Sequence, residues 1–306
     1  MNAENKYVRF DWAVKRMLRD KANFGVLEGL ITVLLNEPIH IVELLESEGN
    51  QDFADDKFNR VDIKAKNDKE EIFLVEVQLI REIYYLERIL YGTAKAVKEH
   101  ICLGNTYNEI KKVYSISIIY FDLGKGADYL YHGQNNFVGV HTHDTLKIST
   151  KENGVIRMRT PEEIFPEYYL IRVNEFNQTA KTPLEEWLDY LKNGHIKDDT
   201  TAPGLQEARE KLQYLMLNKK DRSAYDEHVN AIMIQNDVLG NARLESLAEG
   251  RAEGIKEGIK EGIKEGREKG RAEEKYEIAR KMKQEGMEAE VISKLTGLSF
   301  EEISAL

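Results

Sequence analysis

The stretch that decides the fold reads Arg60-Val-Asp-Ile-Lys-Ala-Lys66, and it is followed by Glu71-Ile-Phe-Leu-Val-Glu-Val-Gln78. Each stretch is a short run in which apolar residues recur, as they do in a strand. The polar residues 67–70 between them, Asn-Asp-Lys-Glu, are typical of a tight turn. The sequence therefore predicts a β-hairpin in this part of the chain.

The polar side chains of this hairpin fall where they can meet. Alternate residues of a strand share a face, so Glu76 and Gln78 point the same way. Val75 and Val77 point to the opposite face. If the two strands pair, Asp62 comes close to Glu76. Two carboxylates at one end of a sheet form an oxygen-rich site that suits Mg²⁺.

Helical and strand patterns alternate around the hairpin. Apolar residues at helical spacing predict helices over residues 9–20, 23–35, 82–101, 183–193 and 204–245. Short apolar runs predict further strands over residues 39–45, 113–121, 136–149, 154–159 and 167–173. This order predicts an α/β fold, with a mixed sheet flanked by helices on its faces.

The ordered set of motifs resembles the PD-(D/E)xK nuclease superfamily and, within it, the recombination-promoting nuclease (Rpn) and transposase family. The resemblance rests on Phe10-Asp-Trp-Ala-Val-Lys15, on the hairpin motifs, and on Glu87-Arg-Ile-Leu-Tyr-Gly-Thr-Ala-Lys95. It covers residues 7–175, and a charged tail punctuated by glycine follows in that family's style. The resemblance implies a restriction-endonuclease-like α/β core followed by an all-helical C-terminal extension. It also implies a metal-dependent DNA endonuclease that acts in DNA recombination.

The resemblance assigns catalysis to Asp62, Glu76 and Gln78. The carboxylates of Asp62 and Glu76, with the backbone carbonyl of Val77, would bind Mg²⁺, with Mn²⁺ as a substitute. Gln78 stands where the superfamily usually has lysine; glutamine orients a water or a phosphate but cannot take a proton. The family commonly carries this Glu-x-Gln form, so the general base stays open, with a metal-bound hydroxide as the economical answer. The alternative is that Glu76 and Gln78 form an exposed strand face.

The helix after the hairpin carries three candidate substrate-binding residues. Arg88, Tyr91 and Lys95 are spaced so that they share one helix face. If this face lies over the end of the sheet, Arg88 and Lys95 can meet a phosphate. Tyr91 can then hydrogen-bond a metal-site carboxylate or the substrate. The alternative is an ordinary polar helix face.

The N-terminal motif adds Lys15 as a substrate-binding candidate and Asp11 as a possible outer-shell carboxylate of the metal site. The alternative is a surface ion pair between these two residues, which lie one helical turn apart. The net charge of the chain is −10, so binding to nucleic acid requires a local basic surface. Lys15 with Arg16, Arg19 and Lys21 forms either that surface or a solvated helix face.

The sequence carries no sign of export or of a membrane partner. Cys102 is the one cysteine, which excludes a disulfide within the chain and fits a reducing compartment. The N-terminal residues lack the apolar region of a signal peptide. The longest apolar runs, such as 113–121, are far shorter than the ~20 residues that a membrane helix needs. We therefore expect a soluble, cytoplasmic protein.

The composition changes near residue 176, beyond which the chain is strongly charged and no strand pattern remains. The expected organisation is a nuclease-like domain over 1–175 and a helical region over 176–245. A glycine-repeat helix or linker follows over 246–275, and a small helical segment over 276–306 closes the chain.

The repeat places a glycine at every fourth position from Gly250 to Gly270. Each glycine in a helix costs about 1 kcal/mol relative to alanine, so a lone helix is disfavoured here. One reading is a seam against which another helix packs, with Ile255, Ile259 and Ile263 beside it and a right-handed crossing. The other is a flexible, charged linker. The favoured reading is a helical self-association segment that makes a homo-oligomer, such as a dimer.

The turn Thr296-Gly-Leu-Ser299 near the C-terminus resembles the turn of a helix-turn-helix, and Ser299 with Glu302 forms a capping box. The following helix opens with Glu301 and Glu302 and has no basic residue. Acidic residues there repel phosphate, which favours packing or dimerisation over DNA contact for this segment.

Three functions are compatible with the sequence. The first is a Mg²⁺-dependent DNA endonuclease, carried by Asp62, Glu76 and Gln78. The second is a non-catalytic oligomeric scaffold, or a DNA-binding protein, that keeps the nuclease fold. The third is an RNA-directed nuclease, because metal–carboxylate chemistry treats both nucleic acids alike.

Overall fold

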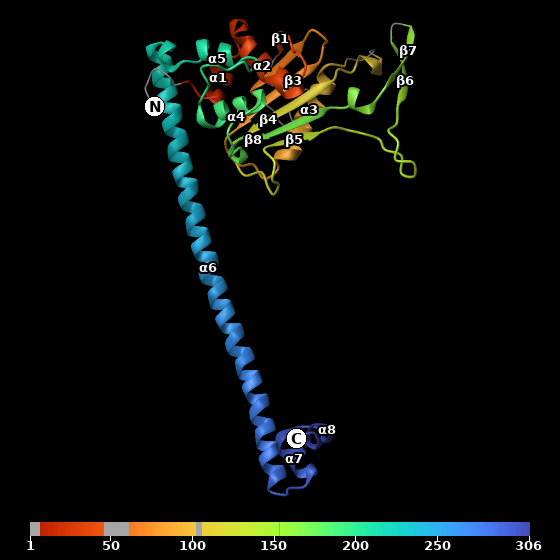
Figure 1. Ribbon diagram of the computed structural model, residues 1–306, viewed down its shortest axis with the longest axis vertical. Coiled ribbons are helices and arrows are strands. Elements are labelled where there is room, and N and C mark those ends of the chain that lie inside the picture. The colour runs from red at the N-terminus through yellow and green to blue at the C-terminus, as the bar shows by residue number, and fades with distance from the viewer. Residues whose placement is uncertain (1–6, 46–60, 102–105, 153) are drawn as a thin grey trace, which may run out of the picture. The chain divides into compact units, whose positions relative to one another are not determined.

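The structure is a computed structural model, which describes residues 7–45, 61–101, 106–152 and 154–306. The chain divides into two compact units, Met1–His228 and Val229–Leu306 (Figure 1). Arg60 of the hairpin motif and Cys102 lie outside the described residues.

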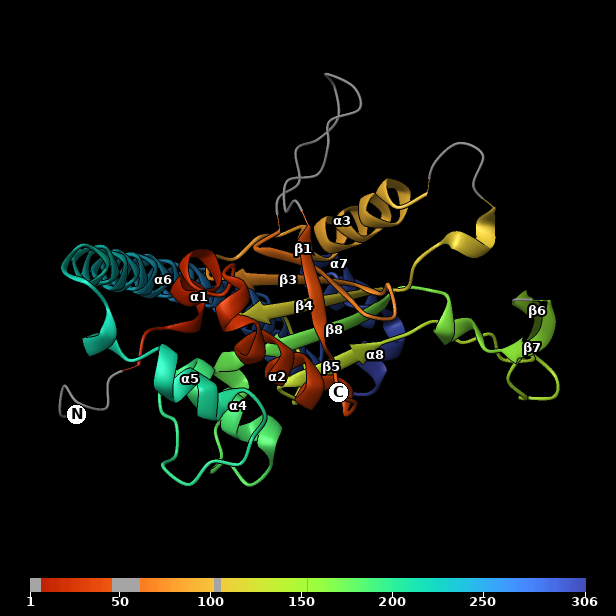
Figure 2. The ribbon, with the colours of Figure 1, turned by 90° about the horizontal axis from the view of Figure 1, so that it is seen from above.

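A six-stranded mixed sheet forms the centre of the first unit (Figure 2). In spatial order the strands are β1 (Ile41–Leu45), β2 (Ile63–Asn67), β3 (Ile72–Gln78), β4 (Val113–Ile119), β8 (Glu167–Arg172) and β5 (Leu130–Gly133). The predicted hairpin is present, since β2 and β3 pair antiparallel with Ile63 opposite Val75. Strands β3, β4 and β8 are parallel, so their carboxyl ends lie at one edge of the sheet. The mixed sheet confirms the predicted fold class.

α-Helices and short 3₁₀ turns surround this sheet. The α-helices of the first unit are α1 (Phe10–Arg16), α2 (Phe24–Leu35), α3 (Tyr85–Glu99), α4 (Pro183–Asn193) and α5 (Leu205–Lys211), and α6 (Lys219–Gln284) begins there. Short 3₁₀ turns are η2 (Lys21–Asn23), η3 (Tyr107–Glu109), η4 (Pro161–Glu163), η5 (Val173–Glu175) and η6 (Tyr214–Met216). Figure 2 shows α1, α2, α4 and α5 grouped together, apart from α3.

Apolar side chains on both faces of the sheet are buried, as expected where helices cover both sides. On the α3 side, Ile72, Leu74 and Val113 pack with Ala96 of the helix. On the other side, Phe73 stacks on Tyr114 with ring centroids 5.0 Å apart. These contacts hold β3 and β4 rigidly in the middle of the core, and the end of β3 carries the candidate catalytic residues.

Three predicted elements are corrected by the structure. The helix predicted over 9–20 ends at Arg16, and Asp20 then caps the separate turn η2. The helix predicted over 204–245 is interrupted between α5 and α6. The strand predicted over 136–149 is mostly irregular, with one isolated bridge between Val138 and Thr145 before the next strand begins. Its apolar residues are exposed, so no burial stabilises a strand there.

A separate hairpin follows this irregular segment. It consists of β6 (Ile148–Glu152) and β7 (Val155–Arg159), which pair only with each other in a two-stranded sheet. Val155, Ile156 and Met158 of β7 are each more than half exposed. The hairpin is therefore an appendage of the first unit and contributes little to its core.

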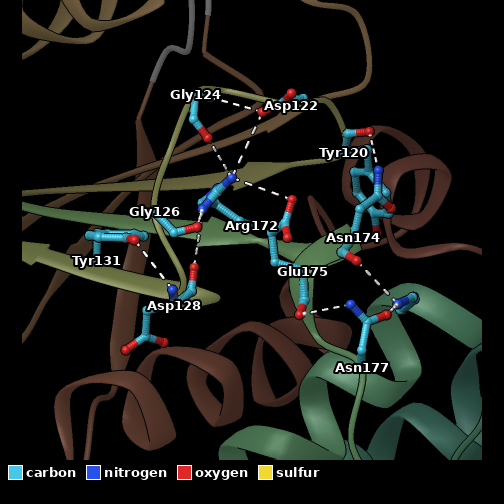
Figure 3. Close-up of polar contacts among 11 residues, drawn as sticks. Tyr120, Asp122, Gly124, Gly126, Asp128, Tyr131, Arg172, Asn174, Glu175 and Asn177 are labelled. Atoms are coloured by element: carbon cyan, nitrogen blue, oxygen red, sulfur yellow. Dashed lines mark hydrogen bonds and ion pairs between the residues drawn. The ribbon is translucent and has the colours of Figure 1, made fainter.

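Arg172 at the end of β8 organises the loop that follows β4 (Figure 3). Its side chain is 5% exposed, and its guanidinium donates to the carbonyls of Gly124 at 2.8 Å, Gly126 at 2.9 Å and Asp128 at 3.3 Å. Glu175 accepts a further bond at 3.3 Å. One guanidinium thus fixes a loop at the same sheet edge as the end of β3, because β3, β4 and β8 are parallel.

Replacing Arg172 with methionine is expected to destabilise the first unit by about 2 to 3 kcal/mol, because hydrogen bonds from a buried charged group are lost and the carbonyls are left unpaired. The measurement is urea unfolding followed by tryptophan fluorescence, which reports this unit alone because both tryptophans, Trp12 and Trp187, are buried in it. Arg81→Met, at an exposed arginine, is the matched control. Equal midpoints for the two variants would contradict this role of Arg172.

In the second unit, α6 runs as one continuous helix to Gln284, and α7 (Ala289–Thr296) and α8 (Phe300–Ser304) follow. A small core joins the end of α6 to these two helices; its buried members are Ala279, Ile292, Leu298 and Ile303. The predicted capping box is confirmed, since Glu302 N donates to Ser299 Oγ and Ser299 N donates to Glu302 Oε2. Outside this core, the apolar side chains of Ile278, Val291 and Leu295 are 42%, 45% and 64% exposed.

The glycine repeat lies inside α6, so it is helical throughout and is not an irregular linker. A Cβ added at any glycine from Gly250 to Gly270 would meet no neighbouring atom within 4 Å. Ile255, Ile259 and Ile263 are each more than half exposed. The glycine row and the isoleucines are therefore open surface in the single chain.

Candidate active site

The β2–β3 hairpin brings the two predicted carboxylates together. Asp62 directly precedes β2, and the register of Ile63 opposite Val75 places it beside Glu76. The Val77 amide donates to Asp62 Oδ2 at 2.7 Å, which fixes the Asp62 side chain against the end of β3. The sequence interpretation placed Asp62 inside the strand, whereas the structure places it at the strand's entrance.

Glu76 is 7% exposed, and the Arg88 guanidinium from α3 forms an ion pair with its carboxylate. Burial raises the pKa of Glu76 to about 7, even though the charge and hydrogen bond of Arg88 act to lower it. The negative charges of Asp62 and Glu82 raise it further. The positive charge of Arg88 is therefore too weak to keep this buried carboxylate at its ordinary pKa, as expected at a site that binds a further cation.

Gln78 and Glu82 extend the site beyond the predicted pair. The Gln78 side-chain amide donates to Glu82 Oε1 at 2.9 Å and to the carbonyl of Ile80 at 3.2 Å. Arg88 also pairs with Glu82, so one guanidinium bridges Glu76 and Glu82. The sequence interpretation missed Glu82, because it placed this residue in a helix over 82–101, whereas α3 begins at Tyr85 and Glu82 lies in the irregular segment after β3.

Two buried hydroxyls lie next to Glu76 without hydrogen-bond partners among the described residues. Ser117 is opposite Glu76 in the β3–β4 register, and Tyr85 is the first residue of α3. Burial raises the pKa of Tyr85 first, and the Glu76 charge raises it further. Buried polar atoms without partners are costly, so these hydroxyls favour a bound water or ligand at this place.

Basic residues from the N-terminal motif border the site on the Asp62 side. Lys15 Nζ of α1 lies 3.9 Å from Asp62 Oδ1, and Arg19 donates to the Asp62 carbonyl at 2.9 Å. Lys15, Arg16, Arg19 and Lys21 are all exposed. The basic surface proposed from the sequence therefore adjoins the carboxylates, and the structure does bring Lys15 to the site.

The three candidates on α3 have different surroundings. Arg88 contacts the carboxylates directly. Tyr91, one turn further, is 38% exposed. The Lys95 ammonium is buried without a hydrogen-bond partner among the described residues. The structure thus brings Arg88 to the carboxylates, whereas substrate binding by Tyr91 and Lys95 stays a prediction.

Asp11 lies in a separate buried network. Arg9 Nε donates to its Oδ1 at 2.9 Å, and His228 Nε2 lies 2.8 Å from its Oδ2. Burial alone would raise the pKa of Asp11, but the hydrogen bonds and charges of His228 and Arg9 outweigh it, and the pKa lies below its ordinary value. Asp11 is fully buried, so the surface pair with Lys15 is wrong. Its oxygens tie α1 to the start of α6, and its role as an outer-shell carboxylate stays a prediction.

Asp11→Asn is expected to destabilise the first unit at pH 7 by roughly 2 kcal/mol, because a buried charge-assisted pair is broken. A carboxyl group whose pKa is lower in the folded than in the unfolded protein stabilises the fold at pH values above its unfolded-state pKa. This contribution is lost as the pH falls through its folded-state pKa. The difference from wild type should therefore shrink below about pH 4. Urea unfolding at pH 3.5 and pH 7 tests this, with Asp68→Asn, at an exposed aspartate, as control. A pH-independent difference would contradict it.

The donor set around Asp62 and Glu76 fits a hard divalent cation. Two carboxylates and the Val77 carbonyl are oxygen donors, and the hydroxyls of Ser117 and Tyr85 beside Glu76 have no hydrogen-bond partner within the described part of the chain. Among the described residues, no group of three or more His, Cys, Asp or Glu side chains could hold a metal ion. Mg²⁺ accepts such a sparse protein set, because it usually keeps waters and takes phosphate oxygens as further ligands.

A mixed sheet with Asp62 and Glu76 at the end of its central hairpin defines the core of a PD-(D/E)xK-type nuclease. Residues 8–242 match the family model described as PD-(D/E)XK nuclease family transposase, and the chain belongs to this family. Residues 272–306 match the model of the Rpn/YhgA-like nuclease family, C-terminal HTH domain. No curated protein and no solved structure matches the chain. The resemblance seen in the sequence motifs is thereby confirmed.

The family assignment supports a nuclease-like function. PD-(D/E)XK nucleases generally use divalent metals, which agrees with the oxygen donors at the end of the hairpin. The C-terminal match describes α7 and α8 as part of a helix-turn-helix domain, which suggests DNA binding. Among the described residues, no helix is both long and apolar enough to cross a membrane.

Proposed function

We propose that this protein is a Mg²⁺-dependent DNA endonuclease of the cytoplasm that hydrolyses phosphodiester bonds during DNA recombination. The observation that carries the proposal is the pairing of Asp62 and Glu76 at the end of the β2–β3 hairpin, inside a PD-(D/E)XK family domain. The family match supports a nuclease-like activity. The metal, the DNA substrate and the recombination role are the proposal.

Each residue of the site has a role that its contacts support. Asp62 and Glu76 would hold Mg²⁺ or Mn²⁺ with the Val77 carbonyl, and the ion would polarise the phosphate and activate a water. Gln78 donates its amide hydrogens, so it can orient a water or a phosphate oxygen but cannot accept a proton. Lys15, at the edge of the site, can pair with the nucleic-acid backbone.

The test is plasmid nicking by purified wild type and by Asp62→Ala, with Mg²⁺, with Mn²⁺ and with a chelator. We expect nicking by the wild type that requires a divalent ion and is lost in the variant, with the fold retained by circular dichroism. A single-stranded RNA substrate, run in parallel, separates DNA from RNA specificity. Equal nicking by both proteins would reveal a contaminant, and absence of cleavage of either substrate would favour the scaffold function.

The HTH match supports DNA as the partner, because this domain class places a helix on DNA. Here the N-terminal turn of α8 carries Glu301 and Glu302, which repel phosphate. The preference for packing over base contact at α8 therefore stays a prediction. In the first unit, the exposed residues Lys15, Arg16, Arg19 and Lys21 supply a basic surface beside Asp62.

We further propose that the protein is a homo-oligomer, such as a dimer, joined through α6. A lone helix with a glycine at every fourth position is penalised by roughly 1 kcal/mol per glycine, so burial against a second helix is expected to compensate. The small residues leave a flat seam, and Ile255, Ile259 and Ile263 supply apolar area beside it.

Deletion of residues 246–306 should reduce the mass measured by light scattering to that of a single chain. Replacing Ile255, Ile259 and Ile263 with glutamate should do the same while leaving the C-terminal core intact. Replacing Lys256, Lys260 and Lys264 with glutamate is the matched control, because it adds charge to the same helix without removing the isoleucines. If the deletion variant and the isoleucine variant have the same mass as the wild type, the chains do not associate through this part of α6.

A further inference from the structure

The bridge that Arg88 forms between Glu76 and Glu82 occupies a carboxylate that the proposed metal ion also needs. Glu76 is 7% exposed, so its carboxylate is largely shielded from solvent. A guanidinium keeps its charge at every relevant pH, and two cations on one buried carboxylate repel each other strongly. Metal binding and the Arg88–Glu76 pair are therefore in competition.

Resting on the proposed nuclease function, we infer that Arg88 is an exchangeable counter-ion that leaves Glu76 when the metal binds and then serves as a binding group for the substrate phosphate. The protein without metal needs such a counter-ion, because a buried carboxylate without one is costly. When the metal ion breaks the Arg88–Glu76 ion pair, the edge of the guanidinium that contacted Glu76 can bind phosphate. This edge lies next to Glu76 and hence next to the position of the scissile phosphate.

Glu82 keeps Arg88 close to the site while the metal ion replaces Arg88 at Glu76. It lies at the rim of the site, where its side chain is 37% exposed, and it holds the other nitrogen of Arg88. Gln78 also donates to Glu82 Oε1, so two donors hold the same oxygen of the Glu82 carboxylate. When Glu76 turns to the metal, Glu82 retains Arg88 at the mouth of the site. The guanidinium then has a short way to move and stays oriented.

The same arrangement couples two binding events. Metal binding converts Arg88 from a partner of Glu76 into a hydrogen-bond donor for phosphate. Substrate that engages Arg88 in turn prevents the guanidinium from returning to Glu76, so it should strengthen metal binding by the same factor. Nucleic acid would then bind tightly only to the metal-loaded protein, and Arg88, as a phosphate-binding residue, links the two binding events.

The test begins with calorimetric titration of Mn²⁺ into the full-length wild type, Arg88→Gln and Arg81→Gln at pH 8.5, where Glu76 is deprotonated. Arg88→Gln removes the competitor and should bind Mn²⁺ about tenfold more tightly, the effect of one moderate charge interaction. Arg81→Gln removes an equal charge from an exposed neighbour and should change the affinity less than twofold. Arg88→Gln affinity equal to or weaker than that of wild type would overturn the inference.

The second readout is the affinity for a short DNA duplex by fluorescence anisotropy, with Ca²⁺ and with a chelator. Ca²⁺ should raise the wild-type affinity about tenfold, and this increase should be absent in Arg88→Gln and retained in Arg81→Gln. An equal increase in all three proteins would overturn the coupling. If the wild type binds no divalent ion at all, the proposed function itself fails, so the two failures are distinguishable.

Discussion

Glu76→Gln should stabilise the metal-free protein by roughly 2 kcal/mol at pH 8, which is an unusual gain for a substitution in an active site. Burial raises the pKa of Glu76 to about 7, well above that of an exposed glutamate. Ionising this residue therefore opposes folding, and Arg88 offsets only part of the cost. A neutral glutamine of the same shape removes the penalty and keeps the packing of β3.

The sign of the pH dependence follows from proton binding. Between about pH 4.5 and 7 the folded protein holds a proton on Glu76 that the unfolded chain has lost, so stability falls as pH rises through this window. Glu76→Gln lacks this contribution. The difference between the two proteins should grow from near zero at pH 5 to its full value at pH 8.

Urea unfolding in the presence of a chelator, followed by tryptophan fluorescence, measures this difference. Asp68→Asn serves as a control for loss of a carboxylate at an exposed position. Addition of Mn²⁺ should reverse the order of stability, because only the wild type gains binding free energy from the ion. A Glu76→Gln protein less stable than the wild type at pH 8 without metal would show that Glu76 is a structural carboxylate.

Asp62→Asn should lower the rate of DNA cleavage by more than about a hundredfold while leaving the fold intact. The Val77 amide donates to Asp62 Oδ2 at 2.7 Å, and the carbonyl oxygen of asparagine can accept the same hydrogen bond. The hairpin register should therefore survive, whereas the negative charge that would hold the ion is lost.

The rate of plasmid nicking, measured next to the urea midpoint, separates these effects. A large loss of rate at an unchanged midpoint assigns Asp62 to the reaction. A loss of rate that follows a loss of stability would assign it to the hairpin. Asp68→Asn, in the hairpin turn, should retain the wild-type rate.

The hairpin and its carboxylates were predictable because they depend on local patterns. Alternation places Glu76 and Gln78 on one strand face, and a short polar turn fixes the pairing of β2 with β3. The parallel neighbours β4 and β8 were also found, since buried strands read as continuous apolar runs.

The parts that the sequence did not predict depend on contacts between distant segments. Asp11 and His228 are far apart in the chain, and no local pattern indicates that they meet. Glu82 lies in an irregular segment, so its direction toward Arg88 has no periodic signal. The residues 136–149 alternate like a strand, but no neighbouring strand pairs with most of them, and alternation alone does not bury them.

The most direct test of the proposed metal site is to measure Mn²⁺ binding to the wild type, Asp62→Asn and Glu76→Gln at pH 8. The electron paramagnetic resonance signal of the free ion reports how much Mn²⁺ each protein binds. If Asp62 and Glu76 jointly hold the ion on which cleavage depends, the wild type removes Mn²⁺ from solution and both variants lose most of this binding. Binding by either variant at the wild-type level would contradict the assignment of the metal site to the end of the β2–β3 hairpin.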